Sequence, residues 1–158
     1  MKYFVGSILG VFIFSIASVV AIAQQESEGR LVGSWNATTT PRVCATGDAI
    51  TMFKATYNFD QGGTLNFVSS GTGSGGRGRE QVGPWKHVTG NRYRFALKAY
   101  IFDANGVSSS YQIVAHEAEL SEDGLSWSSV GISKTYNFAG AEINSGCSTI
   151  VATRDSID

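Results

Sequence analysis

Apolar and polar residues alternate in short runs along most of the chain, and turn sequences rich in glycine, asparagine and aspartate separate these runs. The clearest run spans residues 92–102, where Tyr93, Phe95 and Leu97 share one face and Arg92 and Arg94 share the other. A period of two is typical of a β-strand with one buried and one solvated face. The pattern predicts about eight strands, at residues 30–40, 50–59, 64–69, 80–88, 92–102, 107–120, 125–136 and 147–154.

The connections between the predicted strands are short, which favours antiparallel neighbours. Asn105-Gly106 has the chemistry of a tight hairpin, and Glu122-Asp123-Gly124 separates the next two runs. We predict an all-β fold, an antiparallel up-and-down β-barrel of about eight strands, because closure removes exposed sheet edges. The first and last strands are then neighbours. A two-sheet sandwich is the alternative, and residues 116–120 are ambiguous in phase and compatible with a β-bulge.

The first residues resemble an export signal. Met1-Lys2-Tyr3 supplies a positive charge, an apolar run follows, and Ala21-Ile22-Ala23 matches an A-x-A cleavage pattern. We predict a signal peptide at residues 1–23 and a single barrel domain at 24–158, in a secreted or periplasmic protein with no membrane span after cleavage. The alternative is an uncleaved anchor, because residues 4–23 approach the roughly 20 apolar residues of a membrane-spanning helix.

The chain has two cysteines, Cys44 and Cys147, one near each end of the predicted barrel domain. An even cysteine count in an exported protein favours a disulfide, which here would tie the first strand region to the last. A redox pair or a nucleophilic cysteine is the alternative. The sequence has no C-x-x-C motif, and no histidine lies beside Cys44 to lower its pKa.

Charge and motif spacing exclude several classes of partner. Lys and Arg total 12 and Asp and Glu total 13, for a net charge of −1, which argues against a nucleic-acid partner. His87 and His116 lie far apart without metal-ligand spacing, so we expect neither a metal nor a cofactor. Residues 71–76 match G-x-G-x-x-G only formally, and we expect a hairpin loop there. Alternatively, this loop is a flap whose Arg77 and Arg79 attract an anionic group.

Several short motifs follow one another in a recognisable order. Gly33-Ser34-Trp35 opens the predicted barrel, Gly83-Pro84-Trp85 lies in the fourth strand, and Gly146-Cys147 comes near the end. The first motif resembles the G-x-W opening of lipocalins and other calycin barrels. The order as a whole is similar to a group of small exported bacterial proteins of lipocalin-like type, and the size and meander resemble, more distantly, allene-oxide-cyclase-type barrels. The resemblance implies a calycin-like barrel with a ligand-binding interior.

One short segment carries candidate acid–base chemistry. His116-Glu117-Ala118-Glu119 would place an imidazole on one face of a strand and two carboxylates on the other. A carboxylate facing an apolar interior would have a raised pKa and could act as a general acid or base. His116, Glu117 and Glu119 are therefore the catalytic candidates, and the alternative is a solvated polar end of a strand.

A barrel of this strand number holds either side chains or one small ligand. We expect a ligand cavity to be lined by Phe53, Tyr57, Phe67, Phe95, Leu97 and Tyr111. The first hypothesis is a binding protein for one small hydrophobic molecule. The second is a cofactor-free cyclase or isomerase that folds a reactive hydrophobic substrate, by analogy with allene-oxide-cyclase-type barrels. The third is a filled barrel that acts as an interaction module, and the sequence does not indicate the oligomeric state.

Overall fold

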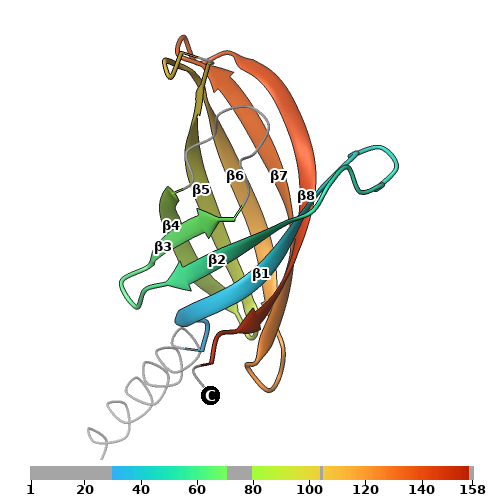
Figure 1. Ribbon diagram of the computed structural model, residues 1–158. Coiled ribbons are helices and arrows are strands. Elements are labelled where there is room, and N and C mark those ends of the chain that lie inside the picture. Colours follow the sequence, from blue (N-terminus) through green and yellow to red (C-terminus); the bar gives the residue numbers. More distant parts are fainter. Residues whose placement is uncertain (1–29, 71–79, 104, 157–158) are drawn as a thin grey trace, which may run out of the picture.

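The structure is a closed antiparallel barrel (Figure 1). The computed structural model describes residues 30–70, 80–103 and 105–156. Each strand pairs with the next along the chain, and the first also pairs with the last, which confirms the predicted up-and-down meander. Within the described ranges, no helix has the length and apolar character needed to cross a membrane. The strands are β1 (Gly33–Arg42), β2 (Phe53–Phe59), β3 (Thr64–Ser69), β4 (Glu80–Thr89), β5 (Arg92–Phe102), β6 (Ser108–Leu120), β7 (Ser126–Asn137) and β8 (Glu142–Arg154).

Two sequence predictions fall on parts of the chain that the structure does not describe. The signal peptide at residues 1–23 and the glycine-rich loop at 71–79, with Arg77 and Arg79, lie outside the described residues. Among the described strands, β3 and β5 have the predicted bounds. The largest difference is in β8, which begins at Glu142 because residues 142–146 pair with the end of β7. This polar stretch has no hydrophobic pattern, so the sequence did not reveal it.

The irregular pairing lies elsewhere than expected. Residues 116–119 pair regularly with β5 and residues 116–120 pair regularly with β7, so the bulge considered there is wrong. The register instead shifts between Ile101 and Phe102, beside the β5–β6 hairpin. That hairpin forms as predicted: Asp103 N donates to Val107 O at 2.9 Å. Gly106 has a φ of 77°, a left-handed conformation that favours glycine.

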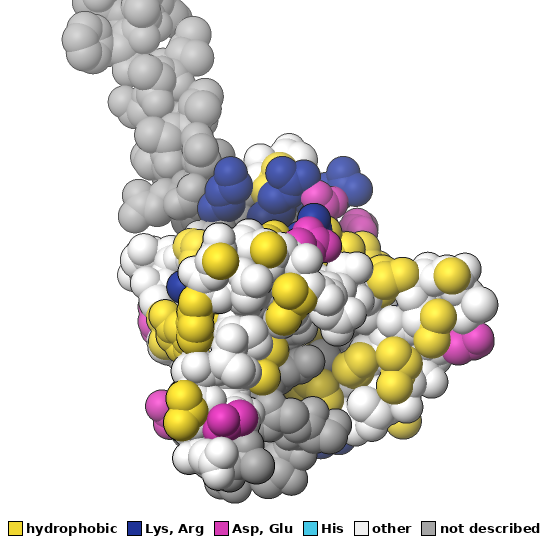
Figure 2. Space-filling view, turned by 90° about the horizontal axis from the view of Figure 1, so that it is seen from above, with side chains coloured by type: hydrophobic (Ala, Val, Ile, Leu, Met, Phe, Trp, Pro, Cys, Tyr) yellow, Lys and Arg dark blue, Asp and Glu magenta, His cyan; other side chains and the backbone are white. Residues whose placement is uncertain are grey.

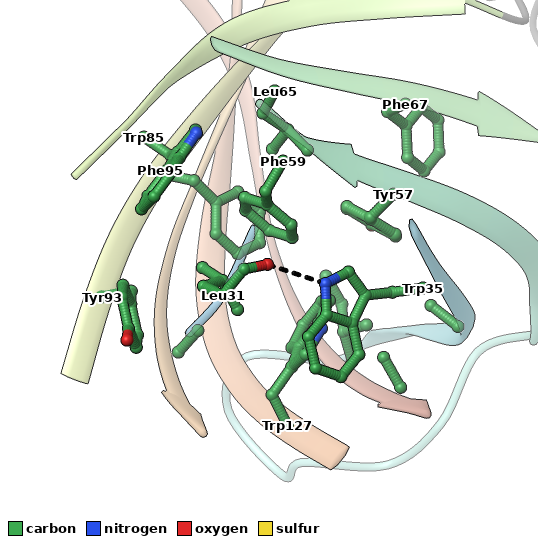
Figure 3. Close-up of a cluster of buried hydrophobic side chains, with 14 of the residues drawn as sticks. Leu31, Trp35, Tyr57, Phe59, Leu65, Phe67, Trp85, Tyr93, Phe95 and Trp127 are labelled. Carbon is green, nitrogen blue, oxygen red and sulfur yellow. Dashed lines mark hydrogen bonds between the residues drawn. The ribbon is translucent and has the colours of Figure 1, made fainter. Parts of the chain in front are cut away.

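The segment before β1 closes one end of the barrel. Leu31 is fully buried, and Trp35 Nε1 donates to its carbonyl at 2.9 Å (Figure 3). Arg30 links two turns of this end by donating to Asn91 Oδ1 at 2.8 Å and to the Glu122 carbonyl at 2.6 Å. We call this the closed end. The opposite end, where the β1–β2, β5–β6 and β7–β8 connections lie, is the far end (Figure 1).

Arg154, near the end of β8, fastens the closed end. Its guanidinium donates to the carbonyls of Gly124 at 3.0 Å, Val32 at 2.9 Å and Arg30 at 2.6 Å. The same group lies 4.1 Å from the centre of the Trp35 ring. A planar, fully charged group can satisfy several carbonyls and stack on an indole face at the same time, which a lysine ammonium cannot.

Large aromatic side chains fill the closed half of the barrel (Figure 3). They pack edge to face, with ring centroids 4.9 Å apart for Tyr57 and Phe67 and 5.7 Å apart for Phe59 and Trp85. Such pairs contribute about 0.5–1.5 kcal/mol each beyond the burial of their area. The cluster comprises Leu31, Trp35, Tyr57, Phe59, Leu65, Phe67, Trp85, Tyr93, Phe95 and Trp127.

The two cysteines meet where β1 leaves the barrel. The sulfurs of Cys44 and Cys147 lie 2.11 Å apart, the distance of a disulfide, and their Cα atoms are 5.1 Å apart. Because β1 pairs with β8, this link fixes the start of the β1–β2 loop to its neighbour strand. The pairing is the one that the sequence predicted.

The face of β6 was assigned wrongly. Tyr111 was expected inside the barrel, but the buried positions of this strand are the even-numbered ones. Tyr111 pairs with Tyr100 and Tyr136 on the outer face, stacking on Tyr136 at 5.4 Å, and Lys98 Nζ lies 4.6 Å from its ring centre. The error arose because an aromatic residue alternates with Gln112, and the polar residue is the one that faces inward.

Candidate functional site

The inner wall of the far half carries shorter and more polar side chains than the closed half. Residues directly opposite on neighbouring strands point to the same face. The buried Leu97 and Ala99 of β5 therefore identify the inward positions of β6, β7 and β8 through the register. We call these positions the far-half wall. They are Leu97, Ala99, Gln112, Val114, Ser133, Thr135, Asn144 and Gly146.

A hydrogen bond confirms this assignment. Gln112 Nε2 donates to Thr135 Oγ1 at 3.3 Å, and both residues are buried. On the other side of the barrel, Thr39 Oγ1 lies 3.2 Å from the Tyr57 hydroxyl, where the aromatic cluster ends. Burial raises the pKa of Tyr57 above its ordinary value, so this hydroxyl stays protonated and can donate. The interior thus changes from aromatic to hydroxyl-bearing along the barrel axis.

His116 lies at the border between the two halves. It belongs to a row of four paired residues, Phe95, His116, Gly131 and Ser148, that crosses β5 to β8. The imidazole stacks on Phe95 with ring centroids 5.2 Å apart and an angle of 4° between the planes. Its Nδ1 lies 2.9 Å from Ser129 Oγ, and its Nε2 lies 3.0 Å from Ser148 Oγ. Both ring nitrogens are therefore hydrogen-bonded.

Gly131 makes this arrangement possible. A Cβ at this position would lie 2.4 Å from His116 Cδ2 and 2.4 Å from the Ala115 carbonyl oxygen, far inside van der Waals contact. Because β7 has no side chain there, the imidazole can lie across the strand. It thereby reaches Ser148, which is two strands away from it.

Burial sets the charge of the imidazole. His116 is 3% exposed, and desolvation lowers its pKa to about 4. At neutral pH the ring is uncharged, and such a ring donates a hydrogen bond from one nitrogen and accepts one at the other. One of the two serines therefore accepts from the ring, and the other donates to it.

The structure separates the three predicted catalytic residues. The imidazole and the two carboxylates lie on opposite faces, as the alternation predicted, but it is His116 that faces the interior, whereas Glu117 and Glu119 are exposed on the outer wall. Glu117 forms an ion pair there with Arg94, whose Nε donates to Glu117 Oε1 at 2.9 Å. The three residues thus do not form one constellation. In the described part of the chain, no three His, Cys, Asp or Glu side chains lie together as metal ligands would.

The six residues expected to line a cavity do not all lie in one place. Tyr57, Phe67 and Phe95 belong to the aromatic cluster of the closed half. Leu97 belongs to the hydrophobic core as well as to the far-half wall, and Phe53, opposite Thr39 in the register, is partly buried against the core. Tyr111 lies on the outer face, as described above. The structure brings other residues into the interior instead, of which only the first is among those predicted from the sequence: His116, Ser129, Ser148, Gln112 and Thr135.

A separate depression lies on the outer wall. It has a volume of about 670 Å³ and an apolar floor at Ala96 and Ala115, with Pro84, Val130 and Ile132 around it. His116 and Gly131 also line it, because the glycine leaves the wall thin at this point. This depression is a second place where an apolar molecule could rest, and any binding experiment must distinguish it from the interior.

No protein-family model and no curated protein matches the chain. Among solved structures, the chain is similar to the crystal structure of Rv2717c from M. tuberculosis, with 14% identity and a TM-score of 0.40. The alignment covers 80% of this chain and 94% of that one. A likeness at this level carries no argument about function. The fold assignment rests on the strand pairing itself.

Proposed function

We propose that the protein binds one small, mainly apolar molecule in the far half of the barrel, as the resemblance to lipocalin-like proteins implies. One observation carries the proposal: the large aromatic side chains gather in the closed half, while the far-half wall contains Ala99, Ser133 and Gly146. Short side chains fill less of the interior than aromatic ones, and a barrel of eight strands can hold one small ligand. Leu97 and Val114 would supply the apolar contacts.

The surface of the far end supports the same proposal. Large apolar side chains are exposed there, with 69% of Met52, 62% of Val107 and 59% of Phe138 accessible. These residues come from three different connections of the far end. Figure 2 looks onto this end: hydrophobic and uncharged surfaces dominate, and the Lys and Arg side chains gather at one edge. An apolar molecule that enters here would meet an apolar rim.

Titration with the neutral fluorescent dye Nile red tests the proposal. Ser133→Phe would place a large ring in the far half, and we expect it to abolish dye binding without unfolding the protein. Ser128→Phe, on the outer face of the same strand, is the matched control and should bind like the wild type. A Ser133→Phe protein that still binds the dye would place the dye outside the far half, for example in the outer depression, and would contradict the proposal. A Ser133→Phe protein that cannot fold would indicate a filled barrel.

The position of His116 favours a second candidate, a cofactor-free isomerase or cyclase. A buried, uncharged imidazole inside the barrel could take a proton from a folded substrate and return it to another atom of the same molecule. Chromatography of an apolar extract of the producing cells, after incubation with the protein, tests this. A new isomer made by the wild type and not by His116→Gln would support it, provided that both proteins bind Nile red equally. No new isomer with either protein would reject it.

A further inference from the structure

We propose that the interior selects an uncharged amphiphile, an apolar body that carries a hydroxyl, carbonyl or amide group, and that it rejects carboxylates. This inference rests on the proposed function, because it names the class of molecule for the same site. The polar group would lie toward Ser148 and His116, and the apolar body would lie against Leu97 and Val114.

The far-half wall contains no charged side chain among the described residues. The charged residues of these strands lie on the other face. Lys98 is exposed beside Tyr111 on the outer surface, and Lys134 donates to Glu142 Oε2 at 2.8 Å, again outside the barrel. Arg154 is partly buried, but it lies at the closed end with its donors bound to carbonyls. Among the described residues, a buried carboxylate would therefore find no cation on the inner face of the far half, although a buried charge needs such a partner.

The polar groups of the interior suit a neutral partner. Each serine hydroxyl has one donor and two acceptor positions, so Ser148 retains hydrogen-bonding capacity beyond its contact with His116 Nε2. When the ring donates to Ser148, the serine O–H can donate to a carbonyl or hydroxyl oxygen of the ligand. Burial keeps the imidazole itself uncharged at neutral pH, so it offers no cation to a carboxylate.

Displacement of Nile red by three compounds with the same chain length tests the inference. At pH 8, dodecanol and methyl dodecanoate should displace the dye, and dodecanoate should bind at least about tenfold more weakly, because its charge would be buried without a partner. Dodecanoate that binds as tightly as the alcohol would overturn the inference and leave the proposed function intact. If the dye itself fails to bind, the proposed function fails, and the inference fails with it.

A charge-introducing variant gives an independent readout. Ser133→Lys would add a cation to the far-half wall, and we expect it to reverse the preference in favour of dodecanoate by about tenfold or more. Ser128→Lys adds the same charge on the outer face of β7 and should keep the wild-type preference. Equal effects of the two lysines would show that the preference comes from the surface, and this would overturn the inference. The far-ultraviolet circular dichroism of both variants checks that each is folded.

Discussion

Replacing Gly131 by alanine tests the row that holds His116. The added Cβ would lie 2.4 Å from His116 Cδ2 and 2.4 Å from the Ala115 carbonyl oxygen, about 1 Å inside the optimal separation of about 3.5–4.0 Å. The carbonyl belongs to the paired backbone of β6 and cannot move freely. The imidazole must therefore tilt away and lose its bonds to Ser129 and Ser148, which are 2.9 Å and 3.0 Å long.

The expected cost follows from two terms. Overpacking costs about 1–3 kcal/mol, and each buried polar group left without a partner costs a further ~1–3 kcal/mol. We expect Gly131→Ala to lower the free energy of unfolding by about 3 kcal/mol. For a domain of this size the melting temperature falls by about 10 °C. Urea denaturation followed by circular dichroism measures the first quantity, and calorimetry measures the second.

Gly62 provides the control. It lies in the β2–β3 turn with no atom within 4 Å of an added Cβ and without a left-handed φ, so Gly62→Ala should change stability by less than about 0.5 kcal/mol. In a His116→Ala background the ring no longer opposes the new methyl group. The cost of Gly131→Ala should then fall by at least about 1 kcal/mol, a coupling expected for residues in contact. Gly131→Ala with wild-type stability, or with the same cost in both backgrounds, would refute this reasoning.

Three further predictions concern stability. Replacing Cys44 and Cys147 together by serine should lower the free energy of unfolding by about 4 kcal/mol in oxidising buffer and by little in reducing buffer, because the disulfide spans 103 residues. Equal melting temperatures of the variant and the wild type in oxidising buffer would contradict this prediction. Arg154→Lys should destabilise the protein by about 2 kcal/mol, since a lysine ammonium cannot donate hydrogen bonds to the same three carbonyls. Calorimetry measures this change, and an unchanged stability would count against the role of Arg154 at the closed end. Burial lowers the pKa of folded His116 to about 4, below the ordinary histidine value of 6.5, so the unfolded chain binds the proton first. The free energy of unfolding should therefore be full above pH 6.5 and fall by up to about 3 kcal/mol as the pH drops to 4. A pH series of urea denaturation should show a smaller decline in His116→Gln, and parallel curves would disprove the assignment.

The sequence predicted the barrel because its most informative strands have one apolar face. In β5 the alternation from Tyr93 to Ile101 fixes both the bounds and the inward face. The pairing of Cys44 with Cys147 followed from the even cysteine count of a predicted exported protein, and it agrees with the meander, since closure makes β1 and β8 neighbours. Periodicity failed in β6, where Gln112 and His116 face inward and Tyr111 outward. A polar inner wall reverses the hydrophobic signal on which such predictions depend.

The His116 site was hidden for a second reason, which is register. The Glu122-Asp123-Gly124 turn correctly places His116 opposite Gly131, and this step could have been worked out from the sequence. The pairing of Gly131 with Ser148 could not have been worked out in this way. A register shift between Thr135 and Tyr136 places Ser148, rather than Cys147, opposite Gly131. A slip of one residue moves a whole strand segment to the opposite face, and nothing in the β7–β8 turn sequence announces it.

The most direct test of the account is native mass spectrometry of the protein isolated from the cells that produce it, followed by extraction and identification of any bound compound. We predict one uncharged, mainly apolar molecule per chain, retained by Ser128→Phe and lost from Ser133→Phe. A bound carboxylate would contradict the proposed selectivity. An empty protein that also fails to bind Nile red would contradict the central claim that the far half of the barrel is a binding site.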